Sequence, residues 1–179
     1  MRIARYEQDG TVRLGFFEDS FVVGLSDAAA ACGGKFAQSD PLTESSDVLD
    51  VLPPDGPLCK LAIELAEAIK RLSGSAREKL AVPTDHVRLL VPIPRPNAIF
   101  LLAGNYAAHI EEGGKKAAAR QETFPYVFMK PPTTITHPGD PVKIPTVSPA
   151  SIDWECELGV VMGRPCKGCL LYTSPSPRD

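Results

Sequence analysis

The sequence predicts an α+β fold that is mainly β, with a small β-rich N-terminal domain over residues 1–85 and a second domain over residues 86–168. Three observations support this fold class. Short apolar runs rich in β-branched and aromatic residues are separated by turn residues. One long amphipathic helix interrupts them. The 18 prolines gather between these runs, which is typical of a protein built from strands and loops.

The N-terminal domain is predicted to begin with a β-hairpin. Apolar runs at residues 2–7 and 11–17 flank Asp9-Gly10, and Asp-Gly is a strong signal for a two-residue hairpin turn. A third short strand is expected over residues 21–25. Residues 35–50 are polar and are predicted to be irregular.

Two helices are predicted in the same domain. Ser26 is expected to cap a short Ala-rich helix over residues 27–32, which Gly33-Gly34 would end. The clearest helix covers residues 57–72, where apolar residues recur at helical spacing behind a proline suited to the first turn. We assign this helix to the scaffold, with no chemistry. The solvent-exposed face of this helix should carry two i,i+4 ion pairs, Lys60–Glu64 and Glu67–Arg71.

The second domain is predicted to alternate strands and loops around one helix. Residues 105–121 are predicted to start as a helix, with Asn105 as a possible cap, and Gly113-Gly114 would interrupt that helix. The strand at 98–104 is expected to be buried because it is apolar throughout. The predicted strands cover residues 87–93, 98–104, 126–130, 141–145 and 153–163.

Composition narrows the class of protein. The net charge is −3 and there is no basic run, so we expect no nucleic-acid partner. No apolar stretch is long enough to cross a membrane and the first residues do not form a signal peptide, so we expect a cytoplasmic location. The five cysteines, an odd number, indicate free thiols.

The last eleven residues, 169–179, read CLLYTSPSPRD and do not continue the pattern before them. They can be back-translated into the read-through of a transposase adapter used in preparing sequencing libraries. We therefore expect the natural sequence to stop near Gly168, which would make Cys169 an artefact and its C-K-G-C spacing with Cys166 meaningless. An ordinary flexible Pro/Ser tail is the alternative.

Carboxylates concentrate in the last predicted strand. Asp153, Glu155 and Glu157 alternate with apolar residues and would share one face of a strand. Glu155 and Glu157 are spaced to chelate one hard cation such as Mg²⁺, Mn²⁺ or Ca²⁺, whose charge would remove their repulsion. A solvated acidic face is the other interpretation. Cys156 points away from the acids and is expected in the core.

A histidine and a lysine are further candidates. His109 stands three residues before Glu112, so the two would share a helix face, and a His supported by Glu is a common general base. A plain surface histidine fits the same pattern. Lys130 ends a strand and could hold a substrate carboxylate, pair with the acidic strand or remain solvated. His86 and His137 are predicted to lie in loops without a role.

Four motifs, read in order, resemble the fumarylacetoacetate hydrolase family between residues 93 and 168. They are G-N-Y-x-x-H-x-x-E, F-x-K-P, P-G-D-P and E-x-E-L-G-V-V-M-G. The resemblance implies an incomplete mixed β-sandwich roll that binds Mg²⁺ or Mn²⁺. It makes Glu155 and Glu157 metal ligands and His109 and Glu112 the water-activating dyad. Tyr106 and Lys130 are our candidates for substrate binding.

The resemblance also implies an activity. Family substrates are β-dicarbonyl or 2-oxo acids, so we expect a metal-dependent hydrolase that cleaves a C–C bond in an acylpyruvate-like acid, working as a homodimer. A decarboxylase, hydratase or isomerase on the same metal site is the nearest alternative, and a non-catalytic β-rich binding module is the alternative of another class. A further Asp ligand and a Lys normally follow E-x-E some tens of residues later, so the chain is expected to be inactive by itself.

Overall fold

The computed structural model describes residues 1–104, 106–114, 124, 126–163 and 165. Contacts divide the chain into two compact units, one formed by residues 1–92 and 138–179 and the other by residues 93–137. The division into domains at residue 85, made from the sequence, stays a prediction.

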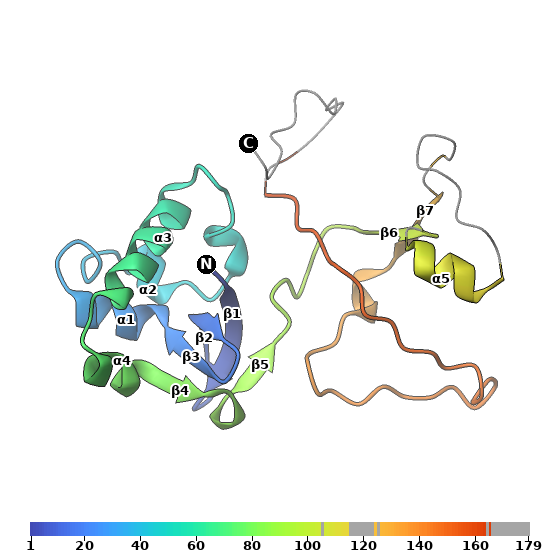
Figure 1. Ribbon diagram of the computed structural model, residues 1–179, viewed down its shortest axis with the longest axis horizontal. Helices are drawn as coiled ribbons and strands as arrows, with labels where there is room; N and C mark the ends of the chain where they lie inside the picture. Colours follow the sequence, from blue (N-terminus) through green and yellow to red (C-terminus); the bar gives the residue numbers. More distant parts are fainter. Residues whose placement is uncertain (105, 115–123, 125, 164, 166–179) are drawn as a thin grey trace. The chain divides into compact units, whose positions relative to one another are not determined.

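A five-stranded antiparallel sheet organises residues 1–92 (Figure 1). The hairpin is confirmed: Asp9 and Gly10 have φ angles of 52° and 74°, the signs that a type I′ turn requires at both central positions. Gln8 and Thr11 close the hairpin as partners in the ladder. The strand order is β4-β3-β2-β1-β5, with β1 (Ile3–Gln8), β2 (Thr11–Glu18), β3 (Phe21–Gly24), β4 (Ala81–Pro83) and β5 (Arg88–Leu90).

The first helix, α1 (Leu25–Cys32), begins earlier than predicted. Gly24 ends β3 and is also the residue before the helix, so Ser26 lies inside the first turn and does not cap it. The predicted end is confirmed, because Gly33 has φ of +65°, which glycine adopts easily.

The prediction that residues 35–50 are irregular is wrong. They contain helix α2 (Asp40–Glu44) and the 3-10 turn η1 (Val48–Asp50). Each of these short elements buries one apolar side chain, Leu42 and Val48. Single buried residues leave no periodic pattern in the sequence, which is why the pattern missed both elements.

Helix α3 (Pro57–Lys70) confirms the clearest helix prediction, with Gly56 before its first turn and Pro57 at the start. The two predicted i,i+4 ion pairs are wrong. Glu64 pairs with Lys35 from the segment after α1, and Glu67 pairs with Lys70, three residues along the helix, at 2.6 Å. Tertiary proximity and rotamer choice therefore decide the partners of these exposed charges. Helix α4 (Gly74–Leu80), which follows, was not predicted.

The described core belongs entirely to the N-terminal residues. α1, α2 and α3 lie together beside the sheet (Figure 1), and α1 contacts α2, α3, β2 and β3. Three consecutive residues of β2 are buried, so both faces of the sheet are covered there. The buried apolar side chains are Tyr6, Leu14, Phe16, Val22, Val23, Leu25, Ala28, Ala29, Leu42, Val48, Val51, Cys59, Ala62, Leu65 and Leu90.

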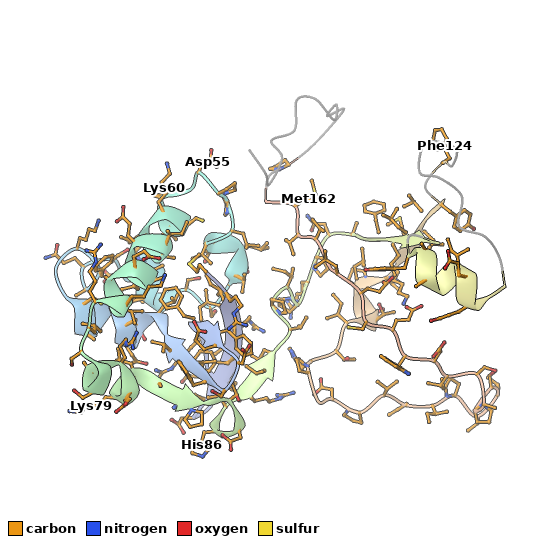
Figure 2. The ribbon with its side chains drawn as sticks, in the orientation of Figure 1. Asp55, Lys60, Lys79, His86, Phe124 and Met162 are labelled. Carbon is orange, nitrogen blue, oxygen red and sulfur yellow. The ribbon has the colours of Figure 1, made fainter. Side chains whose placement is uncertain are left out.

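The unit of residues 93–137 has a two-stranded antiparallel sheet of β6 (Ile99–Ala103) and β7 (Tyr126–Lys130). A helix, α5 (Ala107–Glu112), and a 3-10 turn, η4 (Pro132–Thr134), complete it. Both strands were predicted, but burial of the first was not confirmed, since Phe100 is 67% exposed. Phe124 is 96% exposed and projects from this unit (Figure 2). Two strands and one short helix cannot cover apolar faces on both sides of a sheet.

Residues 138–163, named the strap below, run without helix or strand. The predicted strands at 141–145 and 153–163 are therefore wrong for this structure. Alternating apolar residues indicate a preference for a half-buried pleated surface, but a strand also needs a neighbour for its backbone groups. No described segment pairs with the strap in this way.

The architecture is thus a mixture of helices and antiparallel sheets, consistent with a fumarylacetoacetate hydrolase-like fold. Helical residues outnumber strand residues in the described part of the chain, so the prediction of a mainly β chain is not confirmed there. The sandwich roll stays a prediction. Among the described helices, none combines the length and the apolar character needed to cross a membrane.

Candidate active site

The G-N-Y motif forms the turn between β6 and α5. Gly104 follows the strand with φ of +66°, a conformation in which a side chain would be strained. A Cβ at Gly104 would lie 3.7 Å from Ile110 Cδ1, so the helix packs closely over the turn. Tyr106 is the residue before α5, and its carbonyl accepts the backbone N–H of Ile110 at 3.2 Å. The predicted capping residue, Asn105, lies outside the described residues.

The predicted dyad falls on α5. His109 and Glu112 both belong to this helix, and their spacing of three residues places them on neighbouring positions of one face. The side chain of His109 lies outside the described part. Glu112 is exposed in the last turn of the helix. The helix predicted for residues 105–121 is therefore seen over its first part, and the roles of these two residues stay predictions.

Lys130 ends β7, as the sequence predicted, and its side chain is exposed. It is the ladder partner of Ile99 at the start of β6, whereas Tyr106 follows the other end of β6. The two ends of β6 are four residue steps apart, about 13 Å along the strand. The two predicted substrate-binding residues thus start from opposite ends of the same small sheet.

The E-x-E motif lies in the strap, and Glu155 and Glu157 are both exposed. The neighbouring Trp154 and Leu158 are 83% and 84% exposed, so the expected burial beside the acids is absent among the described residues. Cys156 is exposed as well, which corrects its assignment to the core. Asp153 has a local role: its Oδ1 accepts the backbone N–H of Trp154 at 2.8 Å.

The carboxylates of Glu155 and Glu157 are suitable ligands for a hard divalent cation. A protein site for such an ion needs more donors than two carboxylates supply. In the described part of the chain, no group of three His, Cys, Asp or Glu side chains could hold a metal ion. Glu155 and Glu157 therefore form a partial set of metal ligands, and no described residue joins them as a third ligand.

Of the other residues considered in the sequence analysis, some lie in the described part of the chain and the others lie outside it. His86 ends a 3-10 turn and points away from the N-terminal sheet (Figure 2). Cys32, Cys59 and Cys156 are free, as predicted. Cys166, Cys169 and the suspected adapter residues lie outside the described part. No role was predicted for Asp140 of P-G-D-P, but this residue forms an ion pair with Arg88.

Comparison with known proteins bears on the second half of the chain. Residues 98–174 match the family model "Fumarylacetoacetate (FAA) hydrolase C-terminal". This range contains the turn, α5, β7 and the E-x-E motif described above. It also extends six residues past Gly168, into the stretch that the sequence assigned to an adapter. That assignment stays a prediction.

The chain is also similar to several curated proteins. "Oxaloacetate tautomerase Fahd2a, mitochondrial" of Rattus norvegicus is 30% identical over 122 residues, which is 65% of this chain. "Oxaloacetate tautomerase YisK" of Bacillus subtilis is 39% identical over 81 residues, or 45% of the chain. A Mycobacterium tuberculosis protein is 38% identical over 85 residues, or 48% of the chain.

The chain covers only part of each of these relatives. The aligned residues make up 37% of the rat protein, 26% of the Bacillus protein and 30% of the mycobacterial protein. The second half of the chain is therefore similar to the C-terminal part of the fumarylacetoacetate hydrolase family. The matched range, residues 98–174, contains all six candidate site residues predicted from the sequence.

Proposed function

We propose that the protein to which this chain belongs is an enzyme of the fumarylacetoacetate hydrolase family that acts on a 2-oxo acid through its enol form. The first candidate activity is tautomerisation of an oxaloacetate-like acid. The observation that carries it is the similarity to the rat and Bacillus proteins named as oxaloacetate tautomerases. This choice moves the isomerase, an alternative in the sequence analysis, ahead of the C–C hydrolase.

The roles proposed for the residues follow from proton movement. Converting an enol to its ketone removes the proton from the enol oxygen. It adds a proton to the other carbon of the C=C double bond, the one that does not carry the oxygen. His109, supported by Glu112, would carry this proton, and Lys130 and Tyr106 would bind and orient the acid. When bound by Glu155 and Glu157, a divalent cation such as Mg²⁺ or Mn²⁺ supplies positive charge near the enolate oxygen.

The second candidate is hydrolysis of a C–C bond in an acylpyruvate-like acid. The family description names a hydrolase, and the spacing of His109 and Glu112 suits activation of a water molecule. In this reaction the base takes a proton from water, and the resulting hydroxide adds to the carbonyl carbon. The C–C bond then breaks, which releases a carboxylic acid and leaves the electron pair on the other fragment as an enolate. The enolate carbon finally takes a proton. The two candidates share the enolate and differ in the need for water.

The deciding experiment compares both reactions in the complete protein with added Mn²⁺. Loss of the enol absorbance of oxaloacetate reports tautomerisation, and release of pyruvate from an acylpyruvate reports hydrolysis. We expect His109→Ala to reduce the active reaction by about 10²–10⁴-fold, the usual contribution of a general acid–base group. Glu112→Gln should also reduce it, whereas the neighbouring Glu111→Gln serves as the matched control.

The metal role is tested separately by calorimetry with Mn²⁺. The double variant Glu155→Gln/Glu157→Gln should lose binding, and Asp153→Asn should keep it, because Asp153 already accepts a local backbone hydrogen bond. Activity that survives loss of both glutamates refutes the metal role. A non-catalytic binding module instead predicts neither reaction, no dependence on the ion and no effect of the His109→Ala substitution.

A further inference from the structure

The P-G-D motif has no part in the chemistry proposed above, but the structure gives it a defined position. Pro138 and Gly139 form a turn in which Gly139 has φ of +79°. Glycine adopts this conformation without strain, and proline followed by glycine is the usual pair for such a turn. The turn stands at the start of the strap and is followed directly by Asp140.

Asp140 meets an arginine from the N-terminal sheet. Arg88 Nη2 donates to Asp140 Oδ1 at 3.1 Å. The other terminal nitrogen, Arg88 Nη1, donates to Glu7 Oε2 at 3.5 Å. Arg88 on β5 and Glu7 on β1 are also direct ladder partners, so the cross-strand pair holds the guanidinium in place. One arginine therefore bridges a carboxylate of the sheet and a carboxylate of the strap.

The other end of the strap also lies against the same unit. A Cβ built on Gly163 would be 3.4 Å from Pro54 Cδ and 3.7 Å from the carbonyl oxygen of Leu52. Between these two ends, the strap has no helix, no strand and no buried side chain. A segment without secondary structure or buried side chains detaches from its unit at little free-energy cost. A modest interaction can therefore change the fraction of molecules in which the strap is detached.

We propose that Arg88 is a clamp that fixes the start of the strap to the N-terminal sheet by bridging Glu7 and Asp140. An exposed ion pair is usually weak, but this one acts on a segment that buries no side chain. Arginine suits the role because its planar group offers separate N–H donors to two carboxylates, which a lysine ammonium does not do in a fixed geometry.

The clamp can be tested on the chain as it stands. Lys143 lies three residues beyond Asp140 and is exposed, so trypsin cleavage after Lys143, followed by mass spectrometry, reports detachment. The single tryptophan of the chain, Trp154, is also in the strap, so its fluorescence anisotropy reports mobility of the same segment. Neither measurement involves turnover or a metal, so failure of the clamp is distinguishable from failure of the proposed function.

We expect Arg88→Gln and Asp140→Asn each to speed cleavage after Lys143 about threefold to fivefold and to lower the anisotropy, with no further change in the double variant. The matched control is Arg2→Gln, because Arg2 bridges Glu18 and Asp19 at similar exposure without touching the strap. That control should leave both signals unchanged, and added salt should bring the wild type towards Asp140→Asn.

Two results overturn the proposal. In the first, Asp140→Asn leaves both signals at the wild-type value, whether or not Arg88→Gln changes them. In the second, Arg2→Gln raises cleavage after Lys143 as much as Arg88→Gln does. Asp140 is half-buried, follows the Pro138-Gly139 turn and lies outside the buried apolar core, so Asp140→Asn leaves that core intact and the comparison does not depend on how well Arg88→Gln folds.

Discussion

The hydroxyl of Tyr6 offers a sharp test of how the N-terminal core is held together. Tyr6 lies on β1 between β2 and β5, and its exposed fraction is 0%. Its ring lies against Gly15, and its hydroxyl lies near Gly24 and Asp27, close to where a Cβ of Gly24 would stand. Within the described part of the chain, the buried hydroxyl has no hydrogen-bond partner.

The Tyr6→Phe substitution removes this hydroxyl and keeps the ring. A buried polar group without a partner costs about 1–3 kcal/mol relative to water. Part of this gain is offset by the contacts that the oxygen makes with its neighbours. We therefore expect Tyr6→Phe to raise the free energy of unfolding by about 1 kcal/mol. Tyr6→Ala, which also removes the ring from a filled space, should lower it by about 3–5 kcal/mol.

Urea denaturation followed by far-UV circular dichroism measures both changes. Trp154 is too exposed to report unfolding of this core, so fluorescence is not suitable. Tyr6→Phe should move the midpoint upward with an unchanged slope. A loss of 1 kcal/mol or more in Tyr6→Phe would refute the reasoning, because it would mean that the hydroxyl makes a favourable hydrogen bond in the folded state.

The same residue predicts a dependence on alkaline pH. Burial, followed by the nearby charge of Asp27, raises the pKa of Tyr6 in the folded protein. A raised folded pKa means that the stabilisation is fully present below the unfolded pKa of about 10 and is lost as pH rises through the folded pKa. The Tyr6→Phe variant lacks this loss. Urea midpoints of the two proteins should therefore diverge at alkaline pH.

Three further predictions concern local structure in the N-terminal residues. Ser73→Ala should lower the free energy of unfolding by about 1 kcal/mol in the same urea assay, because the Ser73 hydroxyl accepts the backbone N–H of Ala76 at 3.3 Å at the start of α4. An equal loss in Ser75→Ala would contradict the capping role. Gly15→Ala should lower the free energy of unfolding by about 1–3 kcal/mol, since a Cβ would lie 2.8 Å from the carbonyl oxygen of Val23. An unchanged urea midpoint would mean that β2 and β3 can move apart at this position without cost. The hydrogen bond from Lys70, with its charge, lowers the pKa of Glu67, so this stabilisation is present above the unfolded pKa and is lost as pH falls through the folded pKa. An NMR titration should show the Glu67 midpoint rising in Lys70→Gln, and no rise would exclude that cause.

Elements decided by neighbouring residues could be predicted from the sequence. Asp9-Gly10 closes its hairpin because the two residues themselves tolerate positive φ. α3 forms between Gly56 and Lys70 because its apolar residues recur at helical spacing and make one continuous stripe. The positions of Glu112 on α5 and of Lys130 at the end of β7 follow from the same local rules.

Interactions between distant residues could not be predicted in this way. The alternation around Glu155 and Glu157 indicates a strand, but no described neighbour pairs with that stretch. The partner of Glu64 is Lys35, far away in the sequence, and the partner of Asp140 is Arg88. α2 buries Leu42 in the core, although its sequence has no periodic pattern of apolar residues.

The sequence by itself therefore determined the hairpin, the main helix, the strand and helix that carry Lys130 and Glu112, and the kind of chemistry that the acidic motif can perform. Only the tertiary structure decided which apolar residues are buried, which charges pair and which predicted strands form. The physical reason is that turn and helix preferences act over a few residues of backbone. Burial and strand pairing depend on a partner that can come from anywhere in the chain.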